Sequence, residues 1–378
     1  MPTRDQSHYR VSSAASRTGK VRVPLDDLRT WCHAILRGAG FVQDHAELVS
    51  ESLVDAEARG VSSHGVARVR IYSERLLGGL LNGSARPSII KQTAATAHVD
   101  ADNAVGHAGA FKGLKTAMVK AAAEGAGVSV VRNSNHCGTL GYFARIAAER
   151  GLVTLLATNG PPVMVYYGGR TRAVGTNPIG IGVPRSDGAP LILDMATSAT
   201  ARGRIILAGQ NGGEIPDGWA VDSRGRPTTD PAAALEGAVV PFAGPKGSGL
   251  AMMIDLLCGG LAAAVTGEAI GDMYEEWDRE QRVSHFLLVL DPDSWQGGQA
   301  FRDHVARFAA RVAVLPPAEG FERVLLPGEL EQRAYDLARR DGVTLSGQAY
   351  DDLRLIGEEL EVTAPENVAL QMSRDERA

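Results

Sequence analysis

The sequence predicts an α/β protein in which helical segments from both ends of the chain surround a central sheet. Three observations predict this class. Apolar residues repeat with helical spacing between residues 25 and 77, short β-rich runs follow in the middle of the chain, and helical periodicity returns after about residue 297. The 378 residues are 44% hydrophobic and 22% charged, which is ordinary for a globular chain long enough to bury a sizeable core.

The N-terminal part is expected to form three helices. The first spans residues 25–36 and is ended by two glycines. The second spans residues 44–60. The third is capped by Ser62 or Ser63 and ends before Gly78, because a serine hydroxyl can accept a bond from a free N–H group at a helix start.

The middle of the chain is expected to alternate between strands and helices. Strands are predicted at residues 128–132, 152–158, 191–195 and 286–291. Helices are predicted at residues 111–123, at 140–150 and after Gly249. Beyond residue 297 the pattern is helical again, and "LPGEL" marks a turn within it.

This pattern divides the chain into four parts. They are a disordered tail (1–21), an N-terminal helical segment (22–85), an α/β domain (86–296) and a C-terminal helical segment (297–378) that packs with the N-terminal one. The first 20 residues are polar and rich in Ser and Arg. That composition would also suit a transit peptide, but a disordered tail is the preferred interpretation.

Charge and cysteine content argue against several classes of function. A formal net charge of −5 and a pI near 6.0 argue against a nucleic-acid-binding surface. The longest apolar stretch is interrupted by Asp255, so it is expected to be a buried helix and not a membrane span. Cys32, Cys137 and Cys258 are far apart in the sequence, which favours a reducing, cytoplasmic compartment over a disulfide framework or a zinc cluster.

The stretch "RGVSSHGVARVR" holds the first candidate site. His64 is expected to begin a helix, and Arg68 lies four residues on, on the same face. A histidine exchanges a proton near neutral pH, and an arginine can bind a carboxylate through two parallel bonds. The pair would suit a small acid whose neighbouring oxygen gains or loses a proton. The alternative is a capping histidine beside a solvated arginine.

The stretch "VVRNSNHCGTLGYFARI" holds the second candidate site. His136 lies between Asn135 and Cys137 in a polar loop that joins a predicted strand to a predicted helix. Loops that leave the ends of strands commonly hold ligands in α/β enzymes. The alternative is a turn with a hydrogen-bonded histidine. A metal site is not expected, because no second ligand stands at a recognisable spacing.

Two further stretches suggest a phosphate contact. In "LDMATSATARGRI", Asp194 ends a predicted strand and small hydroxyl residues follow. In "GPKGSGLAMM", Lys246 lies among glycines before a helix, whose free N–H groups could help to hold a phosphate. The stretch is not a Walker A loop, and no G-x-G-x-x-G motif opens a βαβ unit, so a Rossmann fold is not expected.

Taken together, eight ordered motifs resemble those of the malate/L-lactate dehydrogenase-like oxidoreductases, which are distinct from the Rossmann malate and lactate dehydrogenases. The resemblance runs from about Val23 to about Leu360. The motifs are "SHGVAR", "NSNHCGTLGYF", "GTNPIGIGVP", "LDMATSATARG", "IPDGWAVD", "GRPTTDPAAAL", "PFAGPKGSGLAMMIDLL" and "LPGE".

The resemblance implies a mixed central sheet in a non-Rossmann nicotinamide-binding domain and an enzyme that depends on NAD or NADP. Such enzymes interconvert small 2-oxo acids and 2-hydroxy acids, such as malate, lactate or sulfolactate, by hydride transfer. A reductase of a cyclic imino acid or a diketo sugar acid is the alternative within the family. A non-catalytic dinucleotide-binding sensor, and a hydrolase or lyase that uses both histidines without redox chemistry, are alternatives of other classes.

The resemblance also assigns roles to individual residues. His64 and His136 are implied to transfer protons, while Ser63, Arg68, Asn135 and Thr176 are implied substrate contacts. The implied cofactor contacts are Asn159, Gly160, Asp194, Met195, Ala196, Lys246, Gly328 and Glu329.

The sequence departs from the family pattern at two places. Arg70 follows Arg68 where many relatives have a differently placed arginine, and Gly160 stands where many have a serine. Arg204 keeps the basic character of the hydroxy-acid members, which favours an oxo- or hydroxy-acid substrate.

A homodimer is expected mainly from the resemblance. The apolar face formed by Leu25, Leu28, Trp31 and Ile35 is a candidate for surface that one subunit leaves uncovered.

Overall fold

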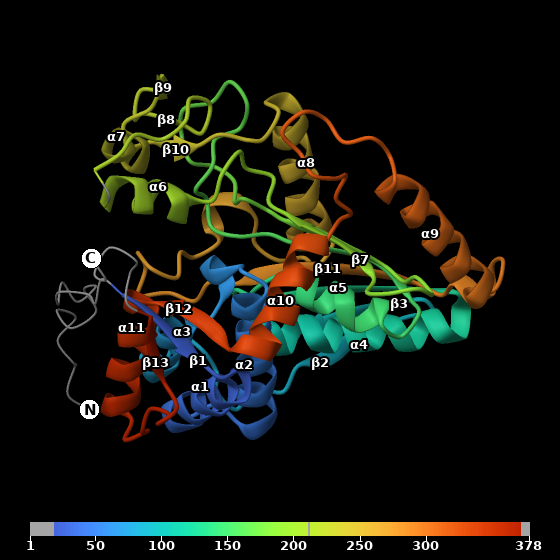
Figure 1. Ribbon diagram of the computed structural model, residues 1–378, viewed down its shortest axis with the longest axis horizontal. Helices are drawn as coiled ribbons and strands as arrows, with labels where there is room; N and C mark the ends of the chain where they lie inside the picture. Colours follow the sequence, from blue (N-terminus) through green and yellow to red (C-terminus); the bar gives the residue numbers. More distant parts are fainter. Residues whose placement is uncertain (1–18, 211, 372–378) are drawn as a thin grey trace.

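A seven-stranded mixed sheet forms the centre of the molecule in the computed structural model, which describes residues 19–210 and 212–371 (Figure 1). Only β3 and β4 run parallel, and the other neighbouring strands are antiparallel. In spatial order the strands are β2 (Ser88–Gln92), β3 (Thr96–Asp100), β4 (Ala126–Ser134), β11 (Val283–Leu290), β5 (Val153–Thr158), β6 (Ile179–Val183) and β7 (Leu191–Met195). The predicted mixed α/β class is confirmed.

Helices cover both faces of this sheet. On one face, α4 (Gly106–Glu124) and α5 (Leu140–Ala148) pack on Val131 and Leu287 of the central strands. On the other face, α8 (Pro245–Asp255) and the π-helix η3 (Leu256–Gly260) pack on Phe286. Phe286 and Leu287 are consecutive, so the alternation of side chains along β11 supplies both cores.

The two ends of the chain form a second layer. Its helices are α1 (Leu25–Ala39), α2 (Gln43–Ala58), η2 (Ser62–His64), α3 (Arg68–Leu77), α10 (Glu329–Asp341) and α11 (Gly347–Glu359). A three-stranded sheet places β1 (Lys20–Val23) between β12 (Val343–Ser346) and β13 (Ala369–Gln371). Most of the predicted tail, residues 1–18, lies outside the described residues, whereas Lys20 and Val21 belong to β1 and not to a tail.

The apolar face of α1 is buried inside its own subunit. Leu28 and Ile35 are fully buried and Trp31 is 3% exposed, in one core with Leu353 and Ile356 of α11. This face therefore does not provide the uncovered surface that the sequence suggested for a partner.

The turn before α3 differs from the prediction. Ser62 and Ser63 do not cap α3, because they lie in the 3-10 helix η2 together with His64, and α3 begins only at Arg68. The N–H of Val66 donates instead to the buried carboxylate of Glu57 on α2, at 3.0 Å. This bond fixes the turn that precedes α3, and the N-cap residue of α3, Ala67, makes no side-chain cap bond.

A small unit and one outlying helix complete the fold. The unit contains β8 (Ala220–Val221), β9 (Pro227–Thr228), β10 (Ala238–Val239), α6 (Arg202–Gln210) and α7 (Pro231–Glu236) around a separate core. After the short helices η4 (Gly267–Ala269) and η5 (Pro292–Ser294), α9 (Gly298–Ala313) lies at the end of the molecule opposite α1 and α11 (Figure 1).

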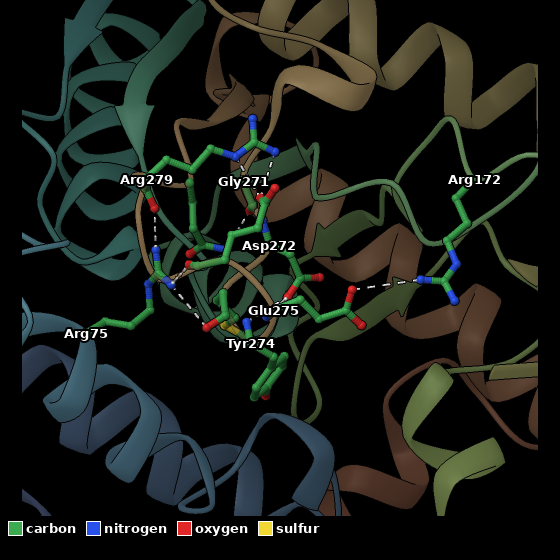
Figure 2. Close-up of polar contacts among 10 residues, drawn as sticks. Arg75, Arg172, Gly271, Asp272, Tyr274, Glu275 and Arg279 are labelled. Atoms are coloured by element: carbon green, nitrogen blue, oxygen red, sulfur yellow. Dashed lines mark hydrogen bonds and ion pairs between the residues drawn. The ribbon is translucent and has the colours of Figure 1, made fainter. Parts of the chain in front are cut away.

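Arg75 on α3 holds the loop formed by residues 271–281. This arginine is 1% exposed, and its Nη atoms donate to the carbonyl oxygens of Met273, Glu276 and Arg279 at 3.1, 2.9 and 3.0 Å (Figure 2). Three backbone acceptors in one loop suit the planar fork of a guanidinium. The loop is thereby fixed against α3, with Tyr274 in the middle of the fixed segment.

Glu275 joins the same loop to the small unit. Its Oε1 accepts a bond from Arg202 at 2.8 Å. Its Oε2 lies 4.0 Å from Nη1 of Arg172 (Figure 2). The loop therefore connects α3 on one side with α6 on the other.

Replacing Arg75 should destabilise the protein more than replacing an exposed arginine of the same loop. Arg75→Met leaves three carbonyl oxygens without their donor, and we expect the free energy of unfolding to fall by about 2–4 kcal/mol. Arg279→Met removes only a largely exposed pair with Glu276 and should cost less than about 1 kcal/mol. Urea denaturation measures both, and equal midpoints would contradict the role assigned to Arg75.

Candidate active site

His64 and His136 lie against each other. Their ring centroids are 5.3 Å apart, and the ring planes are inclined by 27°. His64 comes from η2 and His136 from the loop that joins β4 to α5. The two histidines that the sequence singled out from distant motifs thus meet in one place.

Two donors fix the tautomer of His136. The Tyr72 hydroxyl lies 2.6 Å from Nδ1, and the N–H of Gly138 also points to Nδ1 at 3.4 Å. An amide N–H can only donate, so Nδ1 accepts. Burial raises the pKa of Tyr72, which therefore keeps its proton and donates as well. The neutral imidazole of His136 accordingly carries its proton on Nε2.

Both histidines are neutral in the free protein at neutral pH. Burial, followed by the positive charge of Arg68, lowers the pKa of His64 to about 4. Burial, followed by the charges of His64 and Arg68, lowers the pKa of His136 well below its usual range. The sequence suggested a histidine poised near neutral pH, whereas both rings are neutral in the free site because the pKa of each is depressed.

Arg68 is held beside this pair. Its Nε donates to the carbonyl oxygen of Ser63 at 2.8 Å, while the Ser63 hydroxyl lies 2.9 Å from Nδ1 of His64. The Arg68 guanidinium also lies 5.2 Å from the centre of the Tyr274 ring. The bond from Nε orients the side chain without using its two Nη atoms, which form the part of the fork that faces a carboxylate in bidentate pairs.

Two more histidines lie behind the pair. His107 is fully buried, 5.7 Å from the Tyr72 ring, and His285 bonds the hydroxyls of Ser134 and Thr158, both at 2.8 Å. Burial lowers the pKa of His107 and of His285 to about 3. The wall behind His136 is therefore uncharged, which avoids a further positive charge beside Arg68.

The other two predicted substrate contacts, Asn135 and Thr176, make hydrogen bonds that hold loops of the protein. The amide of Asn135 is buried and donates to Asn103 Oδ1 at 2.9 Å and to the carbonyl oxygen of Ala104 at 2.8 Å. The carbonyl oxygen of Thr176 accepts from the N–H of Thr197 at 2.9 Å. Asn135 thus anchors the loop that carries His136, and Thr176 joins its loop to the end of β7.

The predicted cofactor residues of β7, which include Asp194, lie close to those that precede and begin α10, Gly328 and Glu329. The Asp194 carboxylate accepts from the N–H of Gly141 at 2.8 Å, and desolvation at the start of α5 raises its pKa to about 6 although these N–H bonds lower it. Ile192 donates its N–H to Pro327 at 3.2 Å, just before Gly328. Gly328 has φ +82° and lies so close to Ile192 that a side chain would be crowded.

The remaining predicted cofactor residues lie at the end of β7 and at the start of α8. Met195 and Ala196 end β7, and the carbonyl oxygen of Thr197 accepts from Phe242 at 3.0 Å, which brings the Lys246 loop alongside. Lys246 is exposed in the first turn of α8, which begins at Pro245 and not after Gly249, so the lysine lies within the helix and not in the predicted loop before it.

Asn159 and Glu329 use their side chains within the protein. The Asn159 amide donates to Asp255 at 2.9 Å and accepts from Ser284 at 2.8 Å. Glu329 pairs with Arg333 at 2.7 Å and also contacts Arg323. Both residues therefore shape their surroundings through these bonds.

The arrangement fits a dinucleotide. No described atom lies within 4 Å of the position that a Cβ would take on Gly160, so this backbone faces open space. The exposed Lys246 stands at the N-terminal end of α8, where the helix dipole and the lysine both favour a phosphate. An open backbone segment and a cationic helix start are what a long anionic cofactor requires.

Sequence reasoning missed three residues of the site. Tyr72 and Arg75 follow Arg68 at spacings of four and seven on α3, so helical periodicity alone could have placed them on the face of Arg68. Tyr274 reaches the site from a loop that lies 206 residues after Arg68 in the sequence, and it carries no local signal.

Two other kinds of site are absent from the described residues. No helix in the described ranges is both long and apolar enough to cross a membrane. Within the same residues, no three His, Cys, Asp or Glu side chains are grouped so that they could hold a metal ion.

Known proteins are similar to this chain in both sequence and fold. L-sulfolactate dehydrogenase of Methanocaldococcus jannaschii is 36% identical over 329 residues, which are 86% of this chain and 93% of the relative. The solved structure of the sulfolactate dehydrogenase from that organism superposes with a TM-score of 0.85 at 33% identity, covering 91% of this chain and 98% of the other.

Two other relatives are named for different cofactors. Ureidoglycolate dehydrogenase (NAD(+)) of Escherichia coli O157:H7 is 34% identical over 83% of this chain and 90% of its own. (2R)-3-sulfolactate dehydrogenase (NADP(+)) of Chromohalobacter salexigens is 32% identical over 88% of this chain and 97% of its own.

The family profile described as malate/L-lactate dehydrogenase matches residues 23–354. This range holds both histidines, Arg68 and every residue for which the sequence implied a cofactor contact. The chain therefore belongs to the malate/L-lactate dehydrogenase family.

Proposed function

We propose that this chain is an NAD(P)-dependent dehydrogenase that interconverts a small 2-oxo acid and the corresponding 2-hydroxy acid. The observation that carries the proposal is the stacked pair of neutral histidines beside Arg68. Oxidation of a hydroxy acid needs a base at the hydroxyl and a cation at the carboxylate. The relatives described above carry the names of dehydrogenases that act on such acids.

Arg68 binds the substrate carboxylate and contributes to the protonation state of its neighbours. In the free site burial is the main cause that lowers the pKa of both histidines, and the charge of Arg68 lowers it further. A bound carboxylate offsets that charge, so the pKa of the histidines rises toward the ordinary value once substrate is in place. A base that is neutral before binding and can hold a proton afterwards suits alcohol oxidation, and the protonated form suits the reverse reaction.

Tyr72 and Ser63 orient the two imidazoles. Tyr72 donates to Nδ1 of His136, so the Nε2–H of that ring donates toward the substrate oxygen, while Ser63 contacts Nδ1 of His64 and leaves Nε2 of His64 as the base. When bound, the nicotinamide ring accepts or supplies the hydride at the substrate carbon. The protein residues move the matching proton between the substrate oxygen and an imidazole.

The dinucleotide is proposed to lie along the residues that the sequence implied. Gly160 contributes backbone that faces open space, Asp194, Met195, Ala196 and Gly328 contribute the edge formed by the end of β7 and the turn before α10, and Lys246 faces the phosphates. Asn159 and Glu329 support this edge through their internal bonds.

A homodimer is proposed from an exposed apolar stripe on α8 and η3. The stripe consists of Met252, Met253, Leu256, Leu257 and Leu261, which are 37–58% exposed and recur at helical spacing. A continuous apolar helix face of this kind is typical of an interface between subunits. We also propose a cytoplasmic location, because the three cysteines are unpaired and buried.

Loss of either histidine should slow the chemical step. His64→Asn or His136→Asn should lower kcat by about 10²–10⁴-fold while cofactor binding stays intact, because asparagine keeps hydrogen bonding but does not exchange a proton near neutral pH. His304→Asn, on the remote helix α9, is the control and should be neutral. Steady-state rates with oxaloacetate, pyruvate and a cyclic imine against NADH and NADPH measure this. Full activity in both site variants would refute the assignment.

Removal of the Arg68 charge should weaken substrate binding and move the pH profile. Arg68→Gln should raise KM for the acid by about ten- to a hundredfold. The pKa of His64 is depressed to about 4, so the neutral base persists in acid and kcat/KM for oxidation falls only as the pH drops through that value. Without Arg68 the pKa rises, and the fall should begin at higher pH.

Arg70→Gln is the matched control for this experiment. Arg70 lies on the same helix but pairs with Glu74 at 2.7 Å and lies 3.6 Å from Asp352, away from the histidines. Its profile should stay that of the wild type. If kcat/KM falls at the same acidic pH in the wild type and in both variants, then Arg68 does not influence the pKa of the proton-transferring base.

A charge in the apolar stripe should disrupt the proposed dimer. Leu256→Glu would bury an unpaired carboxylate between subunits and should shift the protein to a monomer in light scattering at micromolar concentration. Val119→Glu, at a 65% exposed position on α4, is the control and should leave the dimer unchanged. A wild-type protein that is monomeric and fully active would contradict the proposal.

A further inference from the structure

A groove lined by arginines runs beside the proposed cofactor residues. Its volume is about 870 Å³, and it lies between α2, α5 and α10, extending to the β6–β7 connection and α9. Two carboxylates line it, Asp55 and Glu149. The arginines are Arg59, Arg145, Arg150, Arg185, Arg302 and Arg339. The lining thus has a formal charge of +4 in a chain whose net charge is −5.

The Asp55 carboxylate in the lining of the groove bonds two buried guanidiniums, those of Arg59 and Arg145. Arg59 Nε lies 3.0 Å from both oxygens of Asp55, and Arg145 bonds the same carboxylate. The arginine side chains are only 9% and 10% exposed. An excess positive charge with so little solvent is costly, and an anion in the groove would offset it.

Other arginines of the lining bond neutral oxygens. Arg150 donates to the carbonyl oxygen of Ile146 at 2.7 Å, and Arg302 donates to Gln299 Oε1 at 2.8 Å. These bonds orient the guanidiniums without compensating their charge, although Asp303, outside the lining, offsets part of the charge of Arg302. Arg185 lies 3.5 Å from Asp187, which offsets part of its charge from outside the lining.

The groove adjoins the proposed position of the dinucleotide. α5, whose first N–H groups bond Asp194, carries Arg145 one turn further on. Gln332, which lines the groove and accepts a bond from Arg59, follows Gly328 by four residues. Pro190 of the lining directly precedes β7. The groove therefore begins where the proposed cofactor residues end.

We propose that this groove is a binding site for a phosphate-bearing anion. Arginine binds phosphate oxygens through paired, directional bonds, and an array of guanidiniums around a central salt bridge matches a dianionic group better than a single carboxylate. Two sources share this chemistry, the 2′-phosphate of NADP(H) and a free phosphorylated small molecule. The first would make the enzyme prefer NADP(H) to NAD(H) and rests on the proposed function; anion binding as such does not.

Two double variants test the proposal. Arg150→Gln with Arg339→Gln removes one charge from each wall of the groove, at exposed positions where folding is not at risk. Arg340→Gln with Arg354→Gln removes two charges that pair at the surface with Asp341 and Glu358, outside the lining. Calorimetry on the purified protein then measures binding of pyrophosphate, ADP-ribose and 2′-phospho-ADP-ribose.

We expect the groove variant to bind pyrophosphate about tenfold more weakly than the wild type, and the surface variant to match the wild type. A wild-type preference for 2′-phospho-ADP-ribose over ADP-ribose that the groove variant loses, together with a raised KM for NADPH alone, identifies the cofactor as the source. Pyrophosphate binding that persists at saturating NADH and is lost in the groove variant identifies a free phosphorylated ligand.

Equal binding of all three probes by the three proteins, or no binding of pyrophosphate and 2′-phospho-ADP-ribose by the wild type, would overturn the proposal. Failure of the proposed function would look different. It would leave pyrophosphate binding intact in a protein that oxidises no hydroxy acid with either cofactor.

Discussion

A positive charge placed beside two imidazoles in a poorly solvated space is the constraint on which this site depends. Arg68 could not sit next to protonated histidines without strong repulsion, and burial together with its charge keeps both rings neutral. The surrounding structure preserves that state. Tyr72 donates to His136, the buried His107 and His285 stay uncharged, and the loop held by Arg75 brings the Tyr274 ring near the guanidinium. The charge is left for a ligand to neutralise.

Much of this could be predicted from the sequence, because the signals are local. Strand β7 matches its predicted range, and both histidines and Arg68 stand in short motifs. What the sequence could not supply is set by distant parts of the chain. The two-residue strands β8, β9 and β10 are too short for any periodicity, and the carboxylate that fixes the turn before α3 comes from another helix. The place of Tyr274 could not be predicted either, since it depends on bonds that the distant Arg75 makes to the loop of Tyr274.

The apolar faces illustrate the limit of periodicity in another way. The α1 face and the stripe on α8 and η3 read alike as helical repeats, yet the first is enclosed by α11 and the second is exposed. Periodicity identifies an apolar face but not the element that covers it. The same holds for charge. The arginines of the groove are scattered over five segments of the chain and become one electrostatic feature only after folding.

The three-stranded sheet that joins the chain ends has a consequence for biosynthesis. β1 lies between β12 and β13, and Val21 and Val23 share a core with Val343 and Leu345. On the ribosome, the first helices to emerge must therefore keep apolar surface open until residues beyond 340 have been translated. Contacts of such long sequence separation are slow to form. The N-terminal helices are therefore translated first but complete their packing last. During most of synthesis their apolar surface is the part of the nascent chain that a chaperone would have to shield.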